Sequence, residues 1–269
     1  MSIALSPFRL VTKHEHDGSH PRVTRRALTL AAALAFVAVG QPASAQKGFL
    51  FKRPVGSFSF RGGYALANAS SDVFSESTRQ LTLSKTDFSA FTWGGDISYA
   101  AKPRIDLVFD GGYSSSTTPS EFRNFIDNND QPIQQTTKYK RVPLTIGLKY
   151  YLTDRGRAVS DFAYIPSKYA PYLGVGAGTM YYRFQQSGDF VDFNTDDLEI
   201  FSTALESNGW APMAQGTAGM DFTIGPWLAL TGEGRYQWAR ARLDPAVFEG
   251  FQKIDLSGFT GTVGFKVRF

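Results

Sequence analysis

Charged side chains recur at every second position in several segments of the sequence. Spacing of two places acids and bases on one face of a β-strand. Such a set can form a buried ion-pair network, line a polar path for ions, or supply paired carboxylates for acid–base chemistry. We interpret it as a paired network that fills a narrow interior, with a polar path for ions or small solutes as the alternative. Its six cations and five anions are Arg61, Arg141, Lys149, Arg235, Lys266 and Arg268 with Asp96, Asp106, Asp110, Asp221 and Glu233.

Enzymatic chemistry is disfavoured by the residue types that the chain lacks. There is no cysteine, and all three histidines lie between His14 and His20, in a segment that we expect to be removed. Thiol nucleophiles and thiolate metal sites are therefore excluded, and no imidazole base remains to activate a serine. A Ser–Lys pair or the carboxylates Asp106 and Asp110 remain formally possible, but both are more simply lumen lining. We predict no catalytic residue, no metal site and no cofactor.

An acidic stretch, residues 186–209, is the remaining candidate for ion binding. Asp192–Asp196 resembles the opening of a calcium loop, but the required glycine is missing and the distal glutamate position holds Thr203. The plainer interpretation is a short helix capped by Asp196, with Glu199 three residues later and an apolar side formed by Leu198, Phe201 and Leu205. The stretch Thr117–Thr136 reads as a flexible polar loop.

The elements that carry the charged residues are eight segments in which apolar and polar residues alternate. The last is the clearest: Phe259, Gly261, Val263, Phe265, Val267 and Phe269 alternate with Thr260, Thr262, Gly264, Lys266 and Arg268. A soluble sandwich also alternates. The segments run to about 10–14 residues, however, where soluble strands average 5–6. Aromatic residues also collect near the ends of the apolar faces, and the polar faces carry full charges. We predict an all-β fold, a transmembrane eight-stranded antiparallel up-and-down β-barrel over residues 56–269.

The links between the segments alternate in length. Short links follow the second and sixth segments, at 100–104 and 225–226, whereas long polar links lie at 68–87, 117–136, 186–209 and 242–254. Short turns on one side and long loops on the other are typical of outer-membrane barrels, with both termini in the periplasm. A long link at 153–169, on the short side, departs from this pattern. Residues 46–55 are expected to form a short periplasmic segment.

The first 45 residues have the order of an export signal. Arg25 and Arg26 precede the apolar run 27–39, and Ala43-Ser44-Ala45 forms a small-residue cleavage site before Gln46. We predict cleavage between Ala45 and Gln46, and location in the outer membrane of a Gram-negative bacterium. The formal charge of +4 includes five basic and two acidic residues of this leader, which leaves about +1 for the rest. Nucleic acid is therefore not an expected partner.

Several stretches resemble the small eight-stranded outer-membrane barrels, especially the outer-membrane protein W group. They are Val142–Thr145, Pro171–Gly178, Trp210 leading into Gly219-Met220-Asp221, and Val263–Phe269. The resemblance implies a monomeric barrel that passes small, hydrophobic solutes through a narrow or gated channel, in some members by a lateral exit through the wall. It also implies that Phe265, Val267 and Phe269 form the signal read by the barrel-assembly machinery. The second functional hypothesis is a structural or adhesive protein with a plugged lumen, whose loops bind lipopolysaccharide or another partner.

Overall fold

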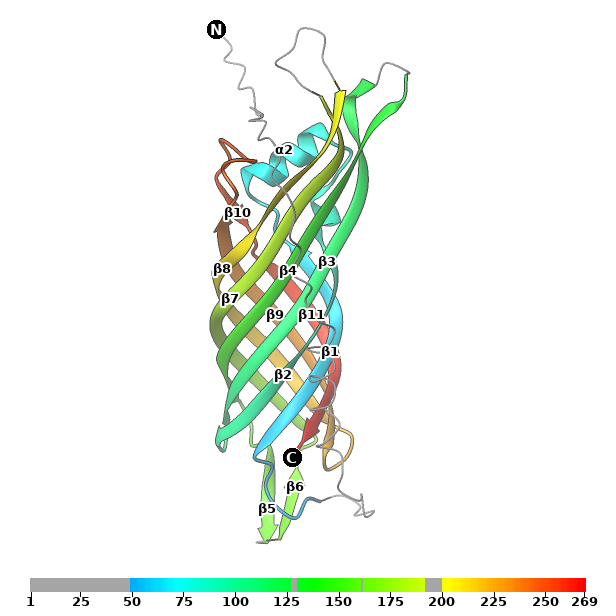
Figure 1. Ribbon diagram of the computed structural model, residues 1–269. Coiled ribbons are helices and arrows are strands. Elements are labelled where there is room, and N and C mark those ends of the chain that lie inside the picture. Colours follow the sequence, from blue (N-terminus) through cyan, green and yellow to red (C-terminus); the bar gives the residue numbers. More distant parts are fainter. Residues whose placement is uncertain (1–48, 127–129, 161, 192–199) are drawn as a thin grey trace, which may run out of the picture.

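Eight long antiparallel strands form a closed ring in the computed structural model, which describes residues 49–126, 130–160, 162–191 and 200–269 (Figure 1). Each strand pairs with its neighbours in the chain, and the first pairs with the last, so the sheet has no edge at the level of the ring. The predicted up-and-down barrel is therefore confirmed. The ring is formed by β1 (Gly56–Ala67), β2 (Ala90–Lys102), β3 (Ile105–Ile126), β4 (Pro132–Tyr151), β7 (Tyr169–Val191), β8 (Ile200–Thr223), β9 (Leu228–Arg242) and β11 (Gly258–Arg268).

The two faces of each strand differ as the alternation predicts. Large apolar side chains point outward and stay exposed around the ring, including Phe60, Trp93, Ile146, Val175 and Phe265. Aromatic pairs mark one border of this belt, because the Trp93 and Tyr113 rings lie 5.6 Å apart and the Tyr181 and Trp210 rings 5.4 Å apart. An apolar exterior around a charged interior is the arrangement that a barrel in lipid requires. Across the described residues, the search for helices able to span a membrane finds no candidate.

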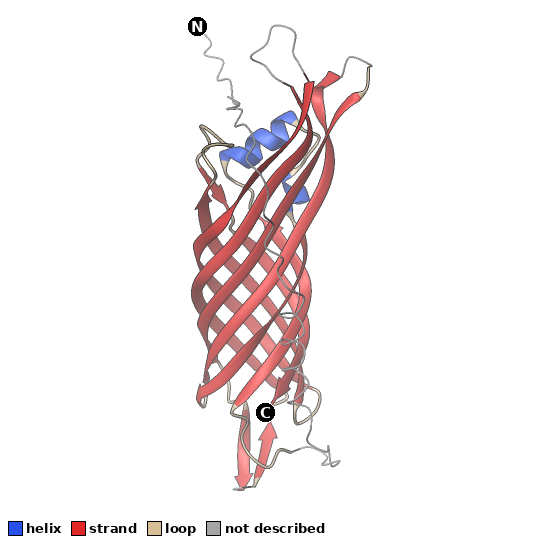
Figure 2. Ribbon diagram, in the orientation of Figure 1, coloured by secondary structure: helices blue, strands red, loops and turns tan. Residues whose placement is uncertain are grey.

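Four strands continue far beyond the belt (Figure 2). Strands β3, β4, β7 and β8 contain 22, 20, 23 and 24 residues, and β7 pairs with β8 as far as Val191 opposite Ile200. At about 3.4 Å per residue and a tilt of about 45°, such strands rise roughly twice the height of the ~25 Å apolar band. The predicted loops at 117–136 and 186–209 are therefore wrong over most of their length. Cross-strand hydrogen bonding continues through these residues, whose inward side chains, such as Phe184 and Leu205, are buried and apolar while polar side chains face outward.

The helix predicted around Asp196 is also wrong where it can be compared, because Phe201 and Leu205 belong to β8. Leu205 is buried, and the Phe201 ring stacks on Phe190 of β7 at 6.2 Å. The cap residue Asp196, with Leu198 and Glu199, lies outside the described residues, as does the start of the suggested calcium loop.

The extracellular mouth is filled by a compact apolar core. The link after β1 forms the helix α2 (Asp72–Gln80) and the 3-10 helix η2 (Lys85–Phe88), and the link after β9 carries the short strand β10 (Lys253–Asp255). Figure 1 shows α2 lying across the barrel end. Phe74 of α2 packs against Phe88, Tyr139 and Phe184 at 4.6, 5.4 and 5.7 Å between ring centroids. Phe248, from the link after β9, contacts Phe184 at 5.8 Å. Two links and four strands, β4, β7, β8 and β9, share this core.

The opposite end carries a second small sheet. The unusually long link between β4 and β7 folds into a hairpin, β5 (Gly156–Ser160) and β6 (Ala163–Pro166). Leu50 adds to its edge through two reciprocal backbone hydrogen bonds with Tyr164, each 2.8 Å long. The chain before β1 is thus fixed against the hairpin, below the barrel end where the C-terminus lies (Figure 1).

Candidate functional site: the charged lumen

Six charged side chains meet at the centre of the barrel. Arg61 of β1 contacts Asp96 of β2 and Asp110 of β3, and Arg235 of β9 contacts Asp110 and Glu233. The Lys149 ammonium lies 3.4 Å from a carboxylate oxygen of Asp96 and 3.4 Å from one of Glu233. Every one of these side chains is at most 9% exposed. The cluster contains three cations and three anions, so its formal charge is zero.

The strand register explains this order. Asp96 and Asp110 are direct partners across β2 and β3, which by itself would set two carboxylates side by side in the lumen. The Arg61 guanidinium bridges them, and Ser59, the partner of Asp96 across β1 and β2, donates a further hydrogen bond. Buried charges are tolerated when each has both an opposite charge and hydrogen bonds. Among the described atoms, only one oxygen of the cluster, Asp96 Oδ1, is buried without a hydrogen bond.

Two further ion pairs lie toward the periplasmic end. Lys266 Nζ is 2.6 Å from Asp221, whose same oxygen accepts a hydrogen bond of 3.1 Å from the Tyr151 hydroxyl. Asp106, the direct partner of Lys149 across β3 and β4, accepts two hydrogen bonds, of 2.7 and 2.9 Å, from Arg155. Eight of the eleven network residues predicted from the sequence thus pair with one another: six in the central cluster, and Lys266 with Asp221.

The other three predicted residues are placed differently. Asp106 pairs with Arg155, which lies outside the predicted set. Arg141 points toward the mouth, donates to the Leu256 carbonyl at 3.3 Å and stacks over Tyr139 at 5.3 Å, so it belongs to the border with the apolar core. Arg268 donates to the Thr223 hydroxyl at 3.0 Å and contacts no carboxylate in the described structure.

Three lumen residues were missed by the sequence interpretation. Tyr172 donates a hydrogen bond of 2.8 Å to Glu233, and the Lys149 ammonium lies 4.9 Å above its ring. It shares the inward parity of Gly174 and Gly176, so alternation contained the signal for it. Tyr151 has the parity of Lys149 in the same strand. Arg155 lies beyond the end of β4, where alternation predicts nothing.

The cavities among the network residues are small. Three of them have volumes of about 30, 30 and 20 Å³, enough for a water or two each but far below the size of a solute site. Above them Gln215 bonds Thr145 at 2.9 Å, and the apolar core then closes the mouth. Charges, amides and aromatic rings therefore fill the barrel in three successive layers.

The residues of the predicted assembly signal lie on the lipid side of β11 and just beyond it. Phe265, Val267 and Phe269 are 57%, 38% and 62% exposed. Phe265 and Val267 pair across the seam with Phe60 and Phe58 of β1. Within the described part of the chain, no group of three or more acidic or histidine side chains is arranged to hold a metal ion.

Comparison with known proteins finds likeness at the level of structure only. No family model matches the chain, and no curated protein matches it. Solved structures of bacterial outer-membrane barrels match over most of their length. OprG from Pseudomonas aeruginosa is 16% identical with a TM-score of 0.42, and the match covers 82% of this chain and 99% of OprG. Outer membrane protein W from E. coli is 17% identical with a TM-score of 0.35, covering 81% and 100%. Neisserial surface protein A is 11% identical with a TM-score of 0.41, covering 80% and 97%. Identities and TM-scores at this level transfer no function to this chain.

Proposed function

We propose that this protein is an outer-membrane barrel with a sealed lumen that acts through its extracellular surface. The observation that carries the proposal is the filling of the lumen by the central ion-pair cluster and by the apolar core of the mouth. The two layers exclude different solutes. The charged cluster opposes the passage of apolar molecules, and the apolar core opposes the passage of ions. Of the two functional hypotheses raised by the sequence, the geometry favours the structural or adhesive one.

The proposed lipid partner of the outer leaflet is lipopolysaccharide, and basic side chains just above the aromatic belt support this. Lys140 lies 5.0 Å from the Tyr113 ring centroid and 5.9 Å from that of Tyr181, on the outward face of β4. Its direct partner across β7 is Arg183. Arg183 is itself paired with Glu206 at 3.1 Å, whereas Lys140 has no carboxylate partner among the described residues, so Lys140 is the cation that an anionic headgroup would meet. The barrel-assembly machinery is the partner proposed for insertion, and the monomer is the proposed state.

Planar-bilayer recording tests the sealed lumen. We expect no unitary current after many insertions of the folded full chain, with insertion checked by the heat-dependent shift in gel mobility. Regular unitary steps from wild-type protein would overturn the proposal. Lipopolysaccharide binding is tested separately with Lys140→Gln, for which we expect weaker binding. Lys253→Gln, an exposed lysine of β10 away from the belt, serves as the matched control. Equal binding by both variants would refute the proposed lipopolysaccharide contact at Lys140, and it would not affect the proposal of a sealed lumen.

A second function, gated transfer of small apolar solutes, is favoured by one feature of the wall. Strand β3 pairs with β4 on both sides of Pro143, but the ladder lacks the pairs at Gly112 and Tyr113. Proline has no N–H to donate, so this seam is weaker than its neighbours. The 30 Å³ cavity touches this point, since both Pro143 and Gly112 line it together with the inward Arg61 and Arg141. A solute crossing the mouth would leave sideways here, above the charged cluster.

Dye transfer into vesicles tests this second function. If solutes leave at the seam, replacing Pro143→Thr should slow uptake of a small apolar fluorophore, because threonine restores the N–H and suits a strand. Thr145→Ser is the matched control, because Thr145 lies on the same inward face of β4 as Pro143, and it should leave uptake unchanged. Uptake equal to that of protein-free vesicles in the wild type would exclude this function and would agree with the sealed barrel.

A further inference from the structure

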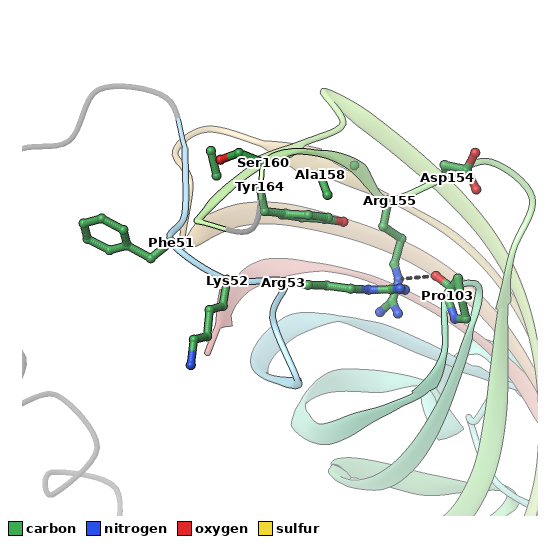
Figure 3. A pocket seen from close by; sticks show the side chains of 11 residues that line it. Phe51, Lys52, Arg53, Pro103, Asp154, Arg155, Ala158, Ser160 and Tyr164 are labelled. Carbon is green, nitrogen blue, oxygen red and sulfur yellow. Dashed lines mark hydrogen bonds between the residues drawn. The ribbon is translucent and has the colours of Figure 1, made fainter.

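A pocket at the periplasmic end lies outside the lumen and has no part in the functions above. It has a volume of about 380 Å³ and is formed between the segment before β1, the β2–β3 turn and the β5–β6 hairpin (Figure 3). Small-molecule sites in proteins usually measure about 300–1,000 Å³. Figure 3 shows the side chains of Arg53 and Arg155 reaching into it, with Tyr164 beside them.

The hairpin that forms one wall is held rigidly to the barrel. Besides its two bonds to Asp106, Arg155 donates to the carbonyls of Pro103 and Lys102 at 3.1 and 3.2 Å, so its hydrogen-bonding capacity is used by protein atoms. The reciprocal bonds between Leu50 and Tyr164 fix the other wall. The pocket is therefore pre-organised, and a ligand would not have to order its walls.

The acidic side chains around this end are already paired. Asp106 is neutralised by Arg155, Asp221 by Lys266, and Asp154 by Arg104 at 2.8 Å. Arg53 has no ion-pair partner among the described residues, and neither has Arg268. The cations therefore exceed the anions here, which makes the pocket attractive to a negative ligand.

A second, narrower cavity continues from the pocket into the barrel end. Its volume is about 30 Å³, and it shares Arg53, Arg155 and Tyr164 with the wider pocket while reaching Arg268. Arg268 Nη1 is buried there and has no hydrogen-bond partner among the described atoms. A buried unpaired donor costs free energy, and a charged one costs more. Burial raises the pKa of the Tyr164 phenol, so its hydroxyl stays protonated and can donate at neutral pH.

We propose that the periplasmic end of the barrel binds a small organic anion, whose carboxylate or phosphate group is held between Arg53 and Arg268. The oxyanion lies where the two cavities meet, with one oxygen directed into the narrow cavity, so that the two guanidinium groups and the Tyr164 hydroxyl donate to it. The rest of the molecule occupies the wider pocket, against Ala158 and Ala163 of the hairpin. Arg155 acts as a positioning residue, because its donors are used to fix the hairpin.

Calorimetric titration of the folded full chain at low salt, with succinate and inorganic phosphate as probes, tests the site. We expect saturable binding of at least one probe, which also identifies the preferred oxyanion. Arg53→Gln should weaken it about tenfold or more, as loss of a charge-assisted contact implies. Arg157→Gln, an exposed residue of the same hairpin that does not line either cavity, should bind as the wild type does.

Two results would overturn the proposal. One is the absence of saturable binding of both probes to wild-type protein at millimolar concentrations. The other is unchanged affinity in both Arg53→Gln and Arg268→Gln with the barrel folded, as judged by gel mobility. Asp221 Oδ1 is also buried without a partner and its residue lines the narrow cavity. Its charge is balanced by Lys266, which also lines that cavity.

Discussion

Glu233→Gln tests whether the central cluster stabilises the barrel as a balanced set of charges. Glu233 touches three cations: it bonds Arg235, lies 3.4 Å from the Lys149 ammonium, and is 3.7 Å from the Arg61 guanidinium. Glutamine keeps the shape and removes the charge, so the cluster changes from zero to one net positive charge. Breaking a buried ion pair from one side costs about 3–5 kcal/mol. Each cation keeps a second carboxylate, Asp96 or Asp110, so we expect the lower end, about 3 kcal/mol.

A compensating change makes the prediction specific. Among the described residues Lys149 forms ion pairs with Asp96 and Glu233 alone, so adding Lys149→Met to Glu233→Gln leaves two cations and two anions. The double variant should be more stable than the sum of the single effects predicts, with a coupling of about 2 kcal/mol, within the usual range for residues in contact. Unfolding by urea in lipid vesicles, followed by tryptophan fluorescence and gel mobility, measures all three variants.

An exposed carboxylate provides the control. Glu121→Gln on the extracellular part of β3 should change the free energy of unfolding by less than about 0.5 kcal/mol. If Glu233→Gln costs no more than this, or if the two lumen changes are additive, charge balance is not what stabilises the cluster and the reasoning fails.

Three further predictions concern other layers of the molecule. Phe184→Ala should lower the free energy of unfolding of the apolar core at the mouth by about 3–5 kcal/mol, the cost of truncating a buried phenylalanine. Residues 68–89 should then exchange amide hydrogens faster and be cleaved more readily by protease. Unchanged exchange there would contradict the shared core. Gly264→Ala should destabilise the barrel, because a Cβ would lie 2.0 Å from the Phe60 carbonyl, whereas Gly232→Ala, with no atom within 4 Å, should be tolerated in the same unfolding assay. Asp106→Asn should release the β5–β6 hairpin and speed tryptic cleavage at Arg155. The exposed Asp154→Asn is the control and should leave the cleavage rate unchanged. Equal cleavage rates in the two variants would show that Asp106 does not hold the hairpin.

Alternation predicted the barrel well because lipid and lumen impose opposite requirements on successive residues. In β11 every second side chain from Phe259 meets lipid, and Lys266, between two of them, is 2% exposed inside. The same alternation assigns Arg61, Asp96 and Glu233 to the lumen face, where all three are buried. The length of the strands was not predictable in this way. Beyond Tyr181 and Trp210 the inward face becomes the apolar one, as Phe184 and Leu205 show, and the outward face becomes polar. The pattern of the lipid-facing strands therefore does not continue into these extensions.

The sequence by itself determined which residues face lipid and which face the lumen, since this depends only on parity within each strand. The tertiary structure decided which charges meet, because contacts such as Arg61 with Asp110, or Arg155 with Asp106, depend on register and ring closure. It also decided that the mouth is closed. Phe74 and Phe248 stand in links that are polar overall, and they become a core only when α2 and the link after β9 fold over the same barrel end. Burial of this kind is a property of residues brought together from distant parts of the chain, and local pattern does not record it.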